Sequence, residues 1–86
     1  MTKSIGQLFR EKREHLGLTQ QVLSKHLGLS SSQYISNIER GLCGPSLDTL
    51  VKLSELLRLD PHKLIDSMVD EYRKNLKQKF RKIKVR

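Results

Sequence analysis

The feature that most constrains the fold is a pair of very short helical patterns separated by only a few residues. The first begins after Thr19, a good N-cap, and ends at Gly28. The second is expected to begin after Ser30 or Ser31 and ends before Gly41. Each is about two turns long, and an isolated helix of that length is marginal in water. The pair must therefore be clamped by other helices.

The rest of the chain supplies three more helical patterns. Ser4 and Gln7 have the spacing of a capping box at the start of the first helix. Ser46, which follows a proline, opens the fourth helix, and Asp60, which precedes a proline, opens the fifth. The apolar residues that share a helical face are Ile5, Phe9 and Leu16 in the first pattern, Leu23 and Leu27 in the second, Ile35 and Ile38 in the third, and Leu47, Leu50, Leu53 and Leu57 in the fourth.

Composition excludes several classes of protein. A chain of 86 residues without an alternating strand pattern is expected to form one all-α domain with a modest core. There is no membrane-length apolar run and no signal-peptide core at the start. The single cysteine, Cys43, fits a reducing cytoplasm, and the three histidines lack partners at metal-binding spacing. We expect no metal, no cofactor and no enzymatic site, because no nucleophile–base pair or phosphate-binding glycine loop can be assembled.

The region around the two short helices resembles the Xre/Cro phage-repressor helix-turn-helix family over about residues 5–65. Three segments carry the resemblance: Leu18–Gly28 (LTQQVLSKHLG), Ile35–Gly41 (ISNIERG) and Pro45–Leu50 (PSLDTL). The resemblance implies a compact, five-helix, lambda-repressor-like domain, in which the second short helix is offered to the major groove of double-stranded DNA.

Two departures from the family pattern stand out. Between Gly28 and Ile35 there is one residue more than the common spacing, which the triple serine is expected to absorb in the turn. Ser24 stands where the family usually has alanine. Neither changes the expected division of the chain into a helix-turn-helix domain over residues 1–70 and a basic amphipathic helical extension over residues 71–86.

Base reading is assigned to the outward face of the third helix. Gln33 could form a bidentate pair with adenine, and Asn37 could do the same one turn later. Ser32 and Ser36, on the same side, are short enough to let the backbone approach the groove. The alternative is that these four residues are merely solvated side chains and helix caps.

Phosphate contacts are assigned to residues around the recognition helix. The family places a phosphate-contacting glutamine at Gln20, and Tyr34 is long enough to reach a phosphate. Three residues of the following loop complete the set: Arg40, Gly41 and Gly44.

Glu39 is not assigned to base reading, because phosphates would repel its carboxylate. By resemblance it should instead pair with Arg13, across the first and third helices. In the loop, a redox-sensing role for Cys43 remains an alternative to an incidental one.

The tail differs from the rest of the chain in its charge. The net charge is +8, and residues 73–86 contain eight basic and no acidic residues, so the front of the chain is neutral overall. A helix from Pro61 to Ile83 would carry an apolar stripe: Ile65, Val69, Tyr72, Leu76, Phe80 and Ile83. Its first half, with Leu64 and Met68, is expected to close the core.

For the second half of the stripe, Tyr72, Leu76, Phe80 and Ile83, the favoured partner is the same helix of a second subunit. Folding back onto the core is the alternative. The basic residues could add phosphate contacts, and the last residues could be disordered without DNA.

These patterns favour a cytoplasmic, nucleoid-associated transcriptional regulator: a homodimeric repressor that occupies a partly palindromic operator. A regulatory protein partner is one possible source of control. The alternative function is a protein-interaction module on the same scaffold, such as an antitoxin or an antagonist of another regulator. A third hypothesis, a basic tail lying on an anionic membrane, has only Phe80 and Tyr72 as aromatic anchors. We therefore expect no membrane partner.

Overall fold

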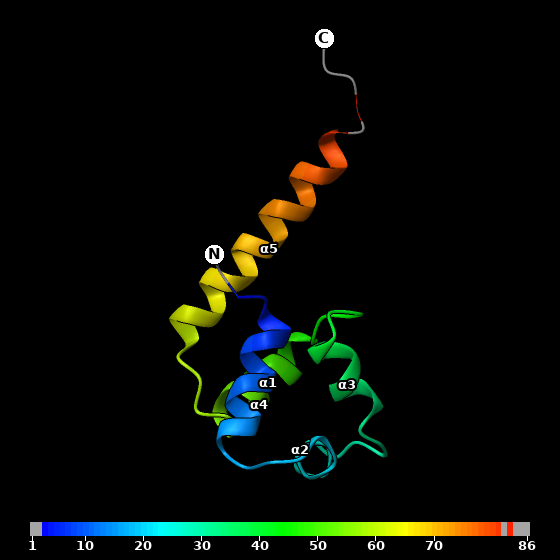
Figure 1. Ribbon diagram of the computed structural model, residues 1–86, viewed down its shortest axis with the longest axis vertical. Helices are drawn as coiled ribbons and strands as arrows, with labels where there is room; N and C mark the ends of the chain where they lie inside the picture. The colour runs from blue at the N-terminus through cyan, green and yellow to red at the C-terminus, as the bar shows by residue number, and fades with distance from the viewer. Residues whose placement is uncertain (1–2, 82, 84–86) are drawn as a thin grey trace.

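The computed structural model describes residues 3–81 and 83, and within them it contains five helices and no strand. They are α1 (Ile5–His15), α2 (Gln20–His26), α3 (Gln33–Glu39), α4 (Leu47–Leu56) and α5 (Pro61–Arg81). Helices α1 to α4 gather into a globular unit, and α5 runs along one side of it and projects beyond (Figure 1). The prediction of an all-α, five-helix fold with an extended C-terminal helix is confirmed.

Side-chain caps hold four of the helix starts at the places that the sequence predicted. They are Ser4, which accepts from the N–H of Gln7 at 3.2 Å, Thr19, which accepts from Val22 at 3.1 Å, Ser46, which accepts from Thr49 at 3.3 Å, and Asp60, which accepts from His62 at 2.9 Å. At Ser4 the capping box is complete, because the Gln7 side chain accepts from the N–H of Ser4 at 3.0 Å.

The start of α3 differs from the prediction. Ser32, not Ser30 or Ser31, occupies its N-cap position, and its side chain makes no cap hydrogen bond. The Ser31 hydroxyl instead accepts from the N–H of Gln33 at 3.3 Å. The three serines form the bend before the helix.

The core is small and is drawn from every helix. Its buried apolar members are Ile5, Phe9, Leu23, Ile35, Ile38, Leu53, Leu57 and Leu64. Two leucines with the same helical spacing are exposed: Leu16, which lies past the end of α1, and Leu47, the first residue of α4. The short helices α2 and α3 are thus held by packing against their neighbours rather than by their own length.

Helices α1 and α3 lie close together at Gly6. A Cβ atom added there would lie 2.5 Å from the backbone oxygen of Ile38 and 2.8 Å from that of Glu39. A glycine inside a helix costs about 1 kcal/mol relative to alanine. Here the close backbone approach offsets that cost and sets how α3 lies against α1.

Helix α5 has two halves with different surroundings. In the first, Leu64 and Ser67 are buried, and Met68 packs against the core. Glu71 links this half to the start of α1, because its Oε1 accepts from the N–H of Ile5 at 2.7 Å. We call α1 to α4 together with residues 61–71 the body, and residues 72–81 the outer half of α5.

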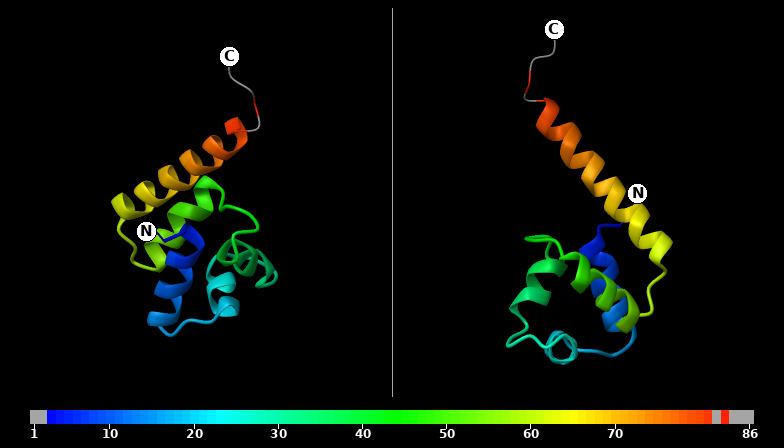
Figure 2. Two further views of the ribbon diagram at one scale, coloured as in Figure 1. Left: turned by 45° about the horizontal axis from the view of Figure 1, so that its top comes forward. Right: turned by 180° about the vertical axis from the view of Figure 1, so that it is seen from behind.

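Every residue of the outer half is exposed, and its last turns stand clear of the other helices (Figure 1; Figure 2, right). It does not fold back onto the core. The helix ends at Arg81, so Ile83 lies outside it. The expected stripe is also uncovered beside the body, where Ile65 is 55% and Val69 46% exposed. Leu64, Ser67 and Met68, on another side of the helix, face the core instead.

Candidate nucleic-acid interface

Helices α2 and α3 form the pair joined by a short turn that the sequence predicted, and α3 lies at the edge of the body (Figure 1). Helix α3 turns Ile35, Ile38 and Glu39 inward, where all three are buried. Gln33 and Arg40 are exposed on its other side. One side of α3 is therefore packed, and the other, polar side is accessible.

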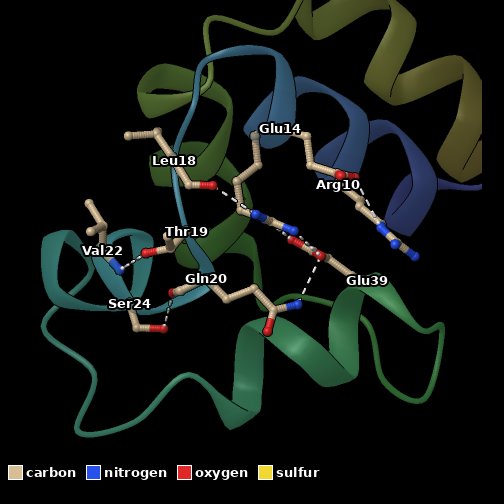
Figure 3. Close-up of polar contacts among 9 residues, drawn as sticks. Arg10, Glu14, Leu18, Thr19, Gln20, Val22, Ser24 and Glu39 are labelled. Atoms are coloured by element: carbon tan, nitrogen blue, oxygen red, sulfur yellow. Dashed lines mark hydrogen bonds and ion pairs between the residues drawn. The ribbon is translucent and has the colours of Figure 1, made fainter.

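A buried polar cluster, which we call the Glu39 clamp, fixes α3 to α1 and α2 (Figure 3). Arg13 Nε donates to Glu39 Oε2 at 2.7 Å, and Arg13 Nη2 donates to Glu39 Oε1 at 3.1 Å. Gln20 Nε2 donates to the same Oε1 at 3.0 Å. Arg13 Nη1 also donates to the backbone oxygen of Leu18 at 2.7 Å, which ties in the linker before α2.

The electrostatics of the clamp explain why it holds. The two side chains of the ion pair are only 11% and 3% exposed, for Arg13 and Glu39. The hydrogen bond to Glu39 raises the pKa of Arg13 above its ordinary value; burial opposes this, and attraction to Glu39 and Glu14 adds to it. Among the described residues, every buried side-chain nitrogen or oxygen has a hydrogen-bond partner. A satisfied network of this kind fixes geometry, and losing one member is expensive.

The accessible side of α3 carries a chain of hydrogen bonds among three side chains. Gln33 Nε2 donates to Asn37 Oδ1 at 2.9 Å, and Arg40 Nη2 donates to the same oxygen at 2.9 Å. Asn37 Oδ1 thus accepts two hydrogen bonds, which is its capacity, and its Nδ2 group keeps its donors. Ser36 lies half-buried between them along the helix, and Ser32 is half-buried at the N-cap position.

The five residues assigned to phosphates lie in different surroundings. Tyr34 is half-buried against the core, and its hydroxyl accepts from the N–H of Ser46 at 3.2 Å, which links α3 to the start of α4. The Gln20 amide is turned toward the clamp. Arg40 and Gly44 are exposed, and Gly41 has φ +78°, a conformation that favours glycine.

Two positions that matter for this geometry were missed from the sequence. Gly6 had a weak signal, because a glycine inside a helical pattern costs stability relative to alanine. Glu71 had none, because its partner Ile5 is 66 residues away in the chain. The second partner of Glu39, Gln20, could not be told apart from a solvent-facing side chain by spacing alone.

Other kinds of site find no support in the described part of the chain. No group of three or more His, Cys, Asp or Glu side chains there could hold a metal ion. No helix there has both the length and the apolar character needed to cross a membrane. Cys43 is a free, exposed thiol in the loop between α3 and α4.

Comparison with known proteins gives three findings. A family model described as helix-turn-helix matches residues 9–64. The "ImmF control region 10 kDa protein" of Bacillus phage phi105 is 40% identical over 58 residues, which are 67% of this chain and 63% of that protein. The "Uncharacterized HTH-type transcriptional regulator y4dJ" of Sinorhizobium fredii is 35% identical over 65 residues, which are 76% of this chain and 83% of that protein.

The chain therefore spans less than two thirds of the length of the phage protein. No solved structure matches.

Proposed function

The chain belongs to the helix-turn-helix family of DNA-binding transcriptional regulators, and we propose that it is a dimeric repressor of a partly palindromic operator. The family is one of DNA-binding proteins rather than enzymes. The observation that carries the proposal is the Glu39 clamp, which holds α3 with its polar side outward. The printed name of the phage relative, a control-region protein, supports a role in control.

In this proposal Gln33 is the main reader of bases. Its Nε2 group has two hydrogens, and only one of them is given to Asn37. The second hydrogen and Oε1 remain for a bidentate pair with adenine, worth about 1–3 kcal/mol of discrimination. Asn37, whose Oδ1 is already saturated, would donate through Nδ2 to a purine acceptor rather than form a second adenine pair. Ser32 and Ser36 would line the approach to the groove.

The phosphate contacts would set the register of α3 without reading sequence. Tyr34 accepts a hydrogen bond from Ser46 and can still donate its own hydroxyl hydrogen to a phosphate. Gln20 likewise keeps one amide hydrogen beside the one it gives to Glu39. Arg40, Gly41 and Gly44 would follow the backbone from the exposed loop after α3.

In this proposal the subunits pair through the apolar residues of the outer half of α5 and one residue beyond its end: Tyr72, Leu76, Phe80 and Ile83. In this proposal residues 1–70 form the DNA-binding domain, and residues 71–86 form the extension that pairs subunits or contacts the DNA backbone. The protein would act in the cytoplasm, bound to the nucleoid. Its occupancy would be set by its concentration, by a partner protein or by degradation.

Selection of sheared genomic DNA by the purified chain, at near-physiological salt and with excess competitor, tests the proposal. We expect an enriched two-fold symmetric site with half-sites about one helical turn apart. Gln33→Ala should relax the preference at one base pair of each half-site, while Gln78→Ala, a matched change on α5, should leave the preferred sequence unchanged. Binding without any enriched sequence would contradict the proposal.

A second candidate function follows from the exposed stripe on α5. A helix-turn-helix protein with an uncovered apolar face could serve as a protein-interaction module, such as an antitoxin or an antagonist of another regulator. Stripe substitutions that abolish a tight complex with another protein, while DNA affinity stays unchanged, would favour this function over the repressor.

A further inference from the structure

Helix α5 packs one side against the core and leaves a second, apolar side uncovered. Leu64 and Ser67 are each 4% exposed and face the core. On another side lies an uncovered stripe whose members recur every three or four residues: Ile65 (55% exposed), Val69 (46%), Tyr72 (68%), Leu76 (37%) and Phe80 (59%). The stripe extends beside the body and along the outer half. A partner that covers the whole stripe must therefore contact most of the length of the helix.

The charge on α5 changes sign along its length. Residues 61–72 contain one lysine and three carboxylates, whereas residues 73–81 contain five basic residues and no carboxylate. Phosphates of DNA or of an anionic membrane would suit the outer half but would be repelled beside the first half. A second copy of α5 running in the opposite direction satisfies both halves, because each basic half then lies along an acidic half. A parallel copy would place like charges together.

The spacing of the stripe suits the same arrangement. Ile65 lies as far before the midpoint between Tyr72 and Arg73 as Phe80 lies after it, and Val69 and Leu76 are related in the same way. A two-fold axis through that midpoint therefore places Ile65 level with Phe80 of the second copy, and Val69 level with its Leu76. Such self-complementarity is what an isologous contact requires.

One pair of charges beside the stripe fits this register. At 100° per residue, Asp66 and Lys77 lie within about 20° of each other around the helix, on the same flank of the stripe. About 16 Å of helix separates them along the axis, so they cannot meet within one chain. With the axis at the stated midpoint, Lys77 of the second copy lies within about 3 Å of the level of Asp66. Both side chains belong to exposed residues.

We propose that two copies of this chain pair through antiparallel α5 helices, with Tyr72 beside its symmetry mate and Asp66 facing Lys77 of the second copy. The inference rests on the dimer in the proposed function and specifies its geometry. Each body then lies at its own end of the helix pair, so the two α3 helices fall on opposite sides of the two-fold axis. A palindromic site needs that placement.

A charge exchange tests the register. Dimerisation of the full-length chain, without DNA, is measured by sedimentation for Asp66→Lys, Lys77→Asp and the double variant. Each single reversal replaces two attractive contacts by repulsions and should weaken the dimer about tenfold, and the double variant should recover most of that loss. Circular dichroism checks that each variant keeps its helices. The register would be wrong if the wild type dimerises but the double variant loses as much dimer affinity as the two single variants lose together.

Disulfide trapping gives a second readout. In a Cys43→Ser background, Val69→Cys chains mixed with Leu76→Cys chains should form a mixed cross-linked dimer, and neither variant should cross-link efficiently with itself. Self-linking of both variants without the mixed product would show parallel helices and overturn the proposal.

The DNA selection above is independent of this result. If the protein selects a two-fold site but fails both tests, the proposed function stands and the antiparallel geometry is wrong. If the wild type stays monomeric at about tens of micromolar, the dimer itself is wrong.

Discussion

The body and the outer half of α5 carry apolar residues at the same helical spacing, yet such residues become buried only in the body. Leu57 is 0% exposed, while Leu76 is 37% and Phe80 59% exposed. The difference teaches that a periodic pattern identifies the apolar side of a helix but does not identify what will cover it. In the body, other helices of the same chain bury part of the apolar pattern, whereas no other part of the described chain covers the outer half.

The same contrast holds for charged pairs. Arg13 and Glu39 meet at 2.7 Å with almost no exposure, and other groups complete their hydrogen bonding. Arg73 and Asp70 lie 3.9 Å apart with side chains 63% and 37% exposed. Water screens the second pair, so it contributes about 0–1 kcal/mol. Position in the fold, not residue type, decides which pair matters.

The largest expected effect is a difference in stability between the same leucine substitution made in the body and in the outer half. Leu57→Ala removes a fully buried side chain and should lower the free energy of unfolding by about 2–5 kcal/mol, because it leaves a cavity in the core. Leu76→Ala, the same change in the outer half, should alter unfolding of the monomer by less than about 0.5 kcal/mol. Urea unfolding at low protein concentration measures both. Equal losses would show that the outer half is packed as the body is.

The next effect compares the two ion pairs. Glu39→Ala leaves the Arg13 guanidinium nearly buried without its carboxylate, and we expect a loss of about 3 kcal/mol in the free energy of unfolding. Arg73→Ala is the matched change in the exposed pair and should cost less than about 0.5 kcal/mol. Thermal unfolding distinguishes them. A small loss for Glu39→Ala would mean that α3 is held by its isoleucines alone.

Features set by residues close together in the sequence were predictable, and features set by contacts between distant residues were not. The starts of α1, α2, α4 and α5 were readable because a cap and its partner are two or three residues apart. The start of α3 was not, since three serines in a row are equally able to cap. The exposure of Leu47 and Val69 depends on which side of each helix meets the core, and that is set by contacts distant in the sequence.

The polar site was readable only in part. The pairing of Arg13 with Glu39 came from a family resemblance, and the atoms lie at bonding distance. The roles assigned to Gln33, Asn37 and Tyr34 remain predictions. The hydrogen bonds of Asn37 with Arg40 and of Tyr34 with Ser46 could not have been foreseen, because helical spacing does not fix the directions of long side chains.

The smallest of the expected effects concerns the approach of α1 to α3, where two physical terms oppose each other. Gly6→Ala should gain about 1 kcal/mol from helix propensity, but its Cβ would meet backbone oxygens of α3 at 2.5 and 2.8 Å. Backbone cannot yield as a flexible side chain does, and overpacking of this kind costs about 1–3 kcal/mol. We therefore expect a net loss of about 1 kcal/mol in urea unfolding.

Gly44→Ala is the control for Gly6→Ala, because nothing lies within 4 Å of the added methyl group. It should leave stability nearly unchanged. If Gly6→Ala instead stabilised the protein, α3 would be free to shift against α1. The Glu39 clamp would then contribute more to the orientation of α3 than the approach at Gly6 does, and in the proposed function Glu39→Ala should cost more in DNA affinity than in stability.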